Sequence, residues 1–215
     1  MKNDLISRCY SVDLETREND NGQASISGIP IVYNSRTDLG WFDEIIDYGA
    51  LNETNLNDVR LCLNHDTSYV YARSRRNNPN STMRLSLTEK GLEINADLAV
   101  NESPKAKDFY SAVKRGDIDK MSFMFSIDQE RWEDLESDHP TRHVEKIGSV
   151  VEVSAVTFPA YDATEINARS KDALDKARLA VETAREQKAE NSLDKEARSK
   201  ELELAKARTE MLLKL

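Results

Sequence analysis

Residues 121–127 read Met121-Ser122-Phe123-Met124-Phe125-Ser126-Ile127, in which two kinds of side chain alternate. Successive side chains of a β-strand point to opposite faces, so Ser122 and Met124 face one way, and Phe123 and Phe125 the other. An aromatic face of this kind packs on a core, which predicts that Ser122 points towards a groove. β-branched and aromatic residues between turn signals predict further strands over residues 26–33, 59–64, 84–87, 92–98 and 150–158.

One helix is well marked in the sequence. Ser103 can cap its start, Pro104 suits its first turn and Gly116 can end it. The apolar positions that fall on one face are Ala106, Phe109, Tyr110 and Val113. A helix among many strands predicts an α+β fold, in the form of a β-rich barrel or a curled sheet flanked by helices.

The composition changes near residue 169. Glycine, proline and aromatic residues all lie before that point, whereas residues 170–215 hold 11 Lys or Arg and 10 Asp or Glu in 46 positions. We therefore predict a folded domain over 1–169 and a helical charged C-terminal tail over 170–215. One seam of the tail helix is apolar at first and then interrupted by Lys188 and Asn191; its members are Leu174, Ala177, Val181 and Ala184. Two interpretations stay open, a solvated charged helix and a scaffold-like helix that binds a partner.

The formal net charge of −9 limits the kinds of partner. It leaves no basic surplus for nucleic acid or for an anionic membrane, so a protein or peptide partner is expected. Two cysteines, Cys9 and Cys62, are too few for disulfides to stabilise a fold of this size, which indicates a reducing compartment. No apolar run approaches the ~20 residues that span a bilayer, so a soluble intracellular protein without a signal peptide is expected.

Three polar residues on separate predicted strands carry groups that could do chemistry. His65 ends an apolar strand, Ser122 lies on the strand described above, and Glu152 is the only charged residue between Ile147 and Tyr161. A hydroxyl, an imidazole and a carboxylate are the parts of an acyl-transfer site, because a serine needs a base and the base needs a group that orients it. Each also has a plainer interpretation: a structural histidine, a half-exposed strand serine, and a carboxylate buried against an arginine.

Other groupings in the sequence are weaker. His139 and His143 stand four residues apart, but Pro140 disfavours the helix that would align them for zinc, so we predict no metal site and no cofactor. Arg73, Arg75 and Arg76 fit a solvated turn, with steering of acidic substrate segments as the alternative.

Four stretches in one order resemble the tailed-bacteriophage (caudoviral) prohead serine proteases. They are Phe42-Asp43-Glu44-Ile45-Ile46 with Gly49-Ala50-Leu51, Leu63-Asn64-His65-Asp66, Met121-Ser122-Phe123-Met124-Phe125, and Val151-Glu152-Val153-Ser154 running on to Phe158-Pro159-Ala160-Tyr161. The resemblance spans residues 28–169. It implies a fold and mechanism similar to those of the herpesvirus assembly proteases.

The resemblance implies roles for the three polar residues. Ser122 would be the nucleophile, His65 its base and Glu152 the third member of the triad. His143 is the alternative third member, because herpesvirus relatives use a second histidine there. The chain has Met124 and Ala72 where family members often carry glycine, so the oxyanion donors are not assigned.

The resemblance also implies a biological role. The chain would be a serine endopeptidase of capsid maturation that cleaves scaffold, or the scaffold-like segment of the major capsid protein, and also itself. It would act inside the immature capsid (prohead) in the host cell cytoplasm. Herpesvirus relatives are dimers, so a homodimer stays open. The competing hypothesis is a non-enzymatic assembly or scaffolding protein whose charged tail binds capsid subunits.

Overall fold

The structure is a computed structural model, which describes residues 5–11, 14–18, 22–157 and 175–190 and six single positions between 195 and 206. The larger of its two sheets has seven strands. They are β1 (Ile6–Ser11), β4 (Arg36–Asp38), β5 (Asp43–Ile46), β6 (Val59–Leu63), β7 (Ala72–Ser74), β10 (Lys120–Glu133) and β11 (Thr141–Val156). The smaller, antiparallel sheet has four strands in the order β2 (Glu15–Glu18), β3 (Ala24–Val32), β9 (Gly91–Leu98) and β8 (Met83–Thr88).

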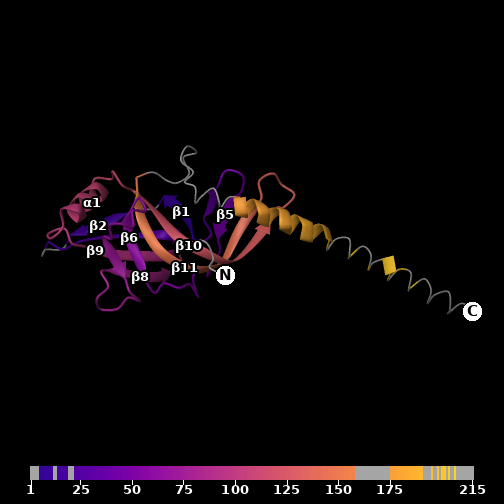
Figure 1. The fold of residues 1–215 in the computed structure, drawn as a ribbon, viewed down its shortest axis with the longest axis horizontal. Coiled ribbons are helices and arrows are strands. Elements are labelled where there is room, and N and C mark those ends of the chain that lie inside the picture. Colours follow the sequence, from indigo (N-terminus) through magenta and orange to yellow (C-terminus); the bar gives the residue numbers. More distant parts are fainter. Residues whose placement is uncertain are drawn as a thin grey trace, which may run out of the picture.

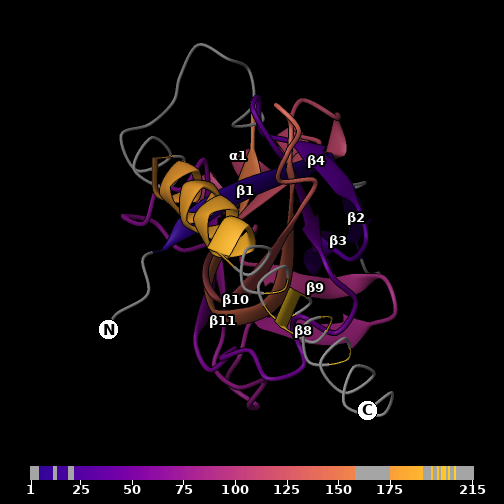
Figure 2. The same ribbon diagram turned by 90° about the vertical axis from the view of Figure 1, so that its right-hand side faces the viewer.

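The two longest strands, β10 and β11, form an antiparallel pair that runs through the larger sheet (Figures 1 and 2). β1 pairs with the outer edge of β10. On its other edge β11 pairs with two different strands, both parallel: β5 along residues 141–144 and β6 along residues 152–155. The start and the end of β11 therefore have different neighbouring strands.

One core lies between the sheets. Ile26 and Ile94 from the smaller sheet pack in the same buried cluster as Phe123 and Val153 from the larger one. The sequence left a barrel and a curled sheet as alternatives, and the barrel is wrong, because the strands of the described residues form two separate sheets. The fold is thus α+β and mostly strands.

The predicted helix is confirmed as α1 (Pro104–Lys114). The Ser103 side chain accepts a hydrogen bond from the backbone N–H of Ala106, which satisfies one of the free donors at the helix start. The predicted apolar face is buried, and Phe109 packs on Tyr71 with ring centroids 4.5 Å apart.

The strands predicted over residues 84–87 and 92–98 are confirmed as β8 and β9, which form an antiparallel hairpin. Gly91, at its turn, has φ of 143°, and a Cβ there would collide with the carbonyl oxygen of Ile31. Only glycine allows this close approach of β3 and β9.

Residues 175–190 form a helix that contacts the domain near β5 and then points away from it (Figure 1). Two members of the predicted seam, Ala177 and Val181, are buried, and Ala177 packs in a small cluster with Leu39 and Phe42. Leu174 and most of residues 191–215 lie outside the described residues. In the described part of the chain, no helix is long and apolar enough to cross a membrane.

Polar contacts also hold this helix on the domain. The Arg178 guanidinium lies 5.6 Å from the centre of the Trp41 ring, and Arg185 donates to the carbonyl oxygens of Leu135 and Ser137. Most other side chains of this helix are exposed.

Candidate active site

Ser122 lies in the middle of the larger sheet, on β10. Its register partners are Cys9 on β1 and Ser154 on β11. Directly opposed residues of antiparallel strands share a face, so Ser122 and Ser154 point to the same side. Phe123 and Phe125 point to the core, as the alternation predicts. Ser122 is only 1% exposed, so in this structure it is covered rather than open to a groove.

His65 lies at the turn that follows β6. Asn64 and His65 both have positive φ, 50° and 59°, which is uncommon for residues other than glycine. Two hydrogen bonds tie the turn to the end of β11: the Asn64 N–H donates to Ala155 O at 2.9 Å, and the Asn64 Oδ1 accepts from the Thr157 N–H at 2.9 Å. This turn brings the imidazole back over the sheet.

Glu152 meets His65 there. Its Oε2 is 2.7 Å from His65 Nδ1, and the two side chains are 3% and 25% exposed. The sequence left an arginine as an alternative partner for this carboxylate. Arg60, the neighbour of Glu152 across the β6–β11 ladder, instead pairs with Asp58 at 2.8 Å.

The contact at Nδ1 sets the chemistry of the ring. A carboxylate accepts a hydrogen bond from Nδ1–H, which leaves Nε2 of His65 as the basic nitrogen. It also stabilises the imidazolium that forms when Nε2 takes a proton. His65 and Glu152 are therefore arranged as a base and the group that orients it.

Ser154 completes the surroundings of this pair. Its hydroxyl donates to Glu152 Oε1 and accepts the backbone N–H of His65 at 3.0 Å. The residue is fully buried. The sequence did not single it out for chemistry, although its place two residues after Glu152 puts it on the same strand face.

Ser122 is bonded to another strand. Its Oγ donates to the carbonyl oxygen of Arg8 on β1 at 2.7 Å. Within the described part of the chain, Ser122 makes no hydrogen bond to His65. The structure thus joins His65 to Glu152 and places Ser122 on the same sheet face, one strand away.

His143, the alternative third member, lies in the other half of β11. Its Nδ1 is 2.7 Å from Asp47 and its Nε2 is 3.2 Å from Glu133. Both ring nitrogens already face acids, and its ladder neighbours are on β5 and β10 rather than on β6.

The residues weighed for metal binding have separate partners. His139 Nε2 lies 3.2 Å from Asp43, near Asp38, away from the contacts of His143. Arg36 also pairs with Asp43 at 2.7 Å. Burial raises the pKa of Asp43, but its bonds to Arg36 and His139 outweigh this effect and the pKa lies below its ordinary value. Existing ion pairs therefore account for this cluster.

The predicted arginine run lies around the turn after β7. Arg73 forms a bidentate pair with Asp58, at 2.6 and 2.7 Å. Arg75 and Arg76 bond to Asn80 and Asn57. These contacts are those of a turn held by its own side chains.

Cys62 is buried beside the site, opposite Ser154 on β6. Burial, with the negative charges of Glu152 and Asp66 nearby, raises the pKa of its thiol to about 12. A thiol with this pKa is not a nucleophile at neutral pH.

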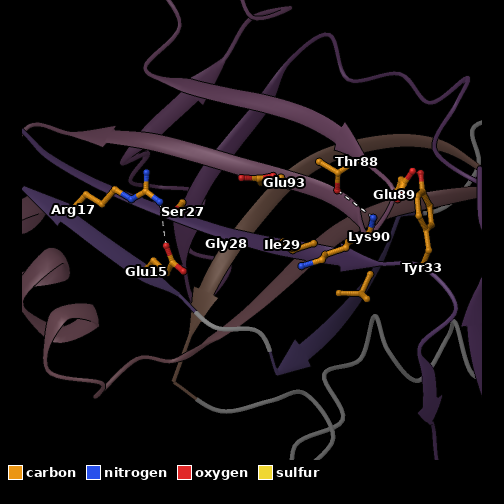
Figure 3. A pocket seen from close by; sticks show the side chains of 11 residues that line it. Glu15, Arg17, Ser27, Gly28, Ile29, Tyr33, Thr88, Glu89, Lys90 and Glu93 are labelled. Carbon is orange, nitrogen blue, oxygen red and sulfur yellow. Dashed lines mark hydrogen bonds and ion pairs between the residues drawn. The ribbon is translucent and has the colours of Figure 1, made fainter.

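A groove of about 1000 Å³ lies elsewhere, on the smaller sheet (Figure 3). Its wall carries Glu15 paired with Arg17, and Thr88 and Lys90 near Tyr33. Neither the serine nor the histidine and glutamate of the site lines it. Its charged side chains are of both signs and exposed, and among them Glu15 pairs with Arg17 at 3.4 Å.

The sheet face carries a serine and a histidine that a buried carboxylate orients. Hydrolytic enzymes that use a nucleophile and a base have such groups in their active sites. The particular family follows from comparison with known proteins. The chain belongs to the caudovirus prohead serine proteases, because the model of that family matches residues 12–177. It is therefore a serine protease of the bacteriophage prohead, and the non-enzymatic hypothesis is wrong.

Comparison with other proteins adds little. The solved structure of the bacteriophage T4 capsid assembly protease, gp21, is similar with a TM-score of 0.40 and 13% identity, covering 71% of this chain and 96% of that chain. No curated protein matches the sequence.

Proposed function

We propose that Ser122 is the nucleophile of this protease, His65 its general base and Glu152 the residue that orients His65. The single observation that carries the proposal is the 2.7 Å contact between His65 Nδ1 and a Glu152 side chain that is 3% exposed. A buried carboxylate costs several kcal/mol unless it is paired or hydrogen-bonded. His65 and Ser154 supply that compensation.

The reaction would run in two steps. Ser122 Oγ attacks the peptide carbonyl while Nε2 of His65 takes its proton, and His65 then gives the proton to the leaving amine. Water next attacks the acyl-enzyme, with His65 again as the base. Glu152 stays ionised throughout and stabilises the imidazolium.

We infer that rotation about χ1 brings the Ser122 hydroxyl towards His65. A serine side chain has three staggered rotamers, and the one described here points at Arg8 O on β1. The Cβ atoms of directly opposed antiparallel residues are about 4.5–5.5 Å apart. A second rotamer therefore directs Oγ towards Ser154 and the turn that carries His65.

Glu152 is a better third member than His143. The acids Asp47 and Glu133 occupy both nitrogens of His143. Glu152 and His65 are in direct contact, and their strands pair along residues 152–155 of β11.

The substrates and setting are inferred from the family. We infer that the chain cleaves scaffold, or the scaffold-like segment of the major capsid protein, and itself, inside the immature capsid in the host cytoplasm. The charged tail over 170–215 would carry the protease into the particle and would then be removed by self-cleavage. Deletion of residues 171–215 should then lower incorporation into particles while cleavage survives.

The test of the site is covalent labelling of the purified protein with a fluorophosphonate probe, followed by mass spectrometry. We expect a single adduct on Ser122, lost in His65→Ala and kept in Ser126→Ala. Ser126 is a matched control, because it is a buried serine on the same strand that bonds to Ser149 instead. Unchanged labelling of His65→Ala would remove the base from the mechanism.

A further inference from the structure

Ser154 joins two parts of the site that lie far apart in the sequence. Through one hydroxyl it bonds the Glu152 carboxylate and the backbone N–H of His65. We propose that Ser154 is a positioning residue, which holds the acid and the histidine turn in the geometry that hydrolysis needs. This inference rests on the proposed function.

The geometry makes the two bonds interdependent. The oxygen bonded to Ser154 is Oε1 of Glu152, which leaves Oε2 for the His65 ring. The bond to the His65 N–H fixes a backbone with φ of 59°, a conformation that a non-glycine residue rarely adopts without support. The Ser154 hydroxyl thus sets both the orientation of the Glu152 carboxylate and the backbone position of His65, from which the imidazole extends.

Ser126 shows what a purely structural serine looks like in the same strand pair. It is also buried, and among the described residues its hydroxyl bonds to the hydroxyl of Ser149 alone, 3.0 Å away. The hydroxyl of Ser154, in contrast, bonds the Glu152 carboxylate and the backbone N–H of His65. Its role is therefore testable against a matched control.

The test compares Ser154→Ala, Ser154→Thr and Ser126→Ala in the full chain. We expect the rate of Ser122 labelling by a fluorophosphonate to fall about 10- to 100-fold in Ser154→Ala, because small displacements of reacting groups cost factors of this size. Ser154→Thr, which keeps a hydroxyl, should recover most of the rate. Ser126→Ala should stay within about twofold of the parent protein.

A second readout separates positioning from general support of the fold. The ring N–H of His65 bonded to Glu152 should give a downfield proton NMR signal in the parent and in Ser154→Thr, and lose it in Ser154→Ala. If Ser154→Ala unfolds, Ser154→Cys, which keeps the volume but bonds weakly through sulfur, takes its place. Retention of both the rate and the signal in a folded variant overturns the proposal. Absence of a Ser122 adduct in the parent overturns the proposed function instead, and the signal still decides the role of Ser154.

A separate observation concerns β1. The carbonyl oxygen of Arg8 on this edge strand accepts a hydrogen bond from the Ser122 hydroxyl, and the strand lies before residue 12, where the family match begins. The Arg8 side chain anchors the strand: its Nε and Nη2 are 2.6 and 3.2 Å from Glu44, which is fully buried and also bonded to Arg142.

From this contact we infer that β1 is an autoinhibitory strand. While it is paired with β10, its carbonyl holds Ser122 in a rotamer that faces away from β11, and the serine is closed to solvent. Local opening of an edge strand frees the hydroxyl to turn towards His65 and uncovers the β10 edge. Activity then depends on how often β1 opens.

A reversible crosslink tests this in the full chain. Ser7 and Met124 are ladder partners, so Ser7→Cys with Met124→Cys can form a disulfide that pins β1 on β10. The control places the crosslink in the smaller sheet, as Ser86→Cys with Glu93→Cys, also ladder partners. The native cysteines are both buried.

We expect the oxidised β1 crosslink to slow labelling of Ser122 at least about tenfold relative to the same protein after reduction, because a pinned strand cannot open. The control should label equally in both states. Equal labelling of the oxidised and reduced β1 variant overturns the inference. Absence of an adduct on Ser122 in every form, including the parent, overturns the proposed function and this inference with it.

Discussion

Replacement of Glu152 by glutamine should slow catalysis strongly while leaving the fold nearly intact. The substitution keeps the shape of the side chain and removes its charge. The contact that it weakens is the 2.7 Å bond to His65 Nδ1, made by a carboxyl group that is 3% exposed. A hydrogen bond to a charged group contributes about 1.5–3 kcal/mol. Because the imidazolium forms only as Ser122 gives up its proton and is absent from the resting enzyme, this loss raises the barrier, and at about 1.36 kcal/mol per tenfold the rate should fall about 10- to 160-fold.

Stability should respond differently. A neutral amide costs less to bury than a carboxylate, and it can still accept the hydroxyl of Ser154. We expect the free energy of unfolding of Glu152→Gln to stay within about 1.5 kcal/mol of the parent value. The assay pairs the rate constant for Ser122 labelling with urea unfolding. Glu145→Gln, on the same strand but bonded to Gln129 and Arg131, is the control and should label normally. Glu152→Gln labelling at the parent rate would refute the reasoning.

Three further outcomes follow from the structure. Burial raises the pKa of Glu44, but its two arginine partners outweigh this effect and the pKa lies below its ordinary value of 4.5. The stability that the ionised Glu44 contributes is therefore present above pH 4.5 and is lost as the pH falls through the lower pKa of the folded protein. Glu44→Gln should cost about 3–5 kcal/mol at pH 7 by urea unfolding, and less in acid. Val181→Asp should shift tryptophan emission to the red, because both tryptophans lie in the cluster that receives helix 175–190, whereas Leu179→Asp, at an exposed site, should not. Cys62, with its thiol pKa raised to about 12, should resist maleimide at pH 8 until the protein is unfolded.

Patterns within short stretches of sequence predicted the strand that carries Ser122 and the helix α1. The alternation of Ser122 with Phe123 placed the aromatic ring in the core and the hydroxyl on the other face. The caps and spacing around α1 predicted its ends and its buried face. Periodicity and capping depend on neighbours within a few residues, so one sequence contains enough information for them.

The arrangement of strands could not be predicted in the same way. β11 pairs with β5 along one half and with β6 along the other, and no pattern within its residues specifies either partner. The barrel alternative stayed open for that reason. The packing of Ala177 in a cluster with Phe42 is likewise a long-range feature.

The sequence predicts the members of the candidate site but not their geometry. His65 and Glu152 meet because β6 runs parallel to the end of β11 and the chain then turns at Asn64. Ser154 had a visible signal, its place on the face of Glu152, but its bond to the His65 backbone depends on that same strand pairing. No signal in the sequence predicted the hydrogen bond from Ser122 to Arg8 on β1, since no strand was predicted over residues 6–11.

The central claim is that Ser122 cleaves peptide bonds with His65 as its base. Its most direct test expresses the protease with its own major capsid protein and scaffold and measures the masses of all three chains in assembled particles. The parent and Ser126→Ala should yield shortened substrate and protease chains. Ser122→Ala should fold, enter particles and leave every chain intact. Shortened chains in particles that contain only the Ser122→Ala protease would contradict the account.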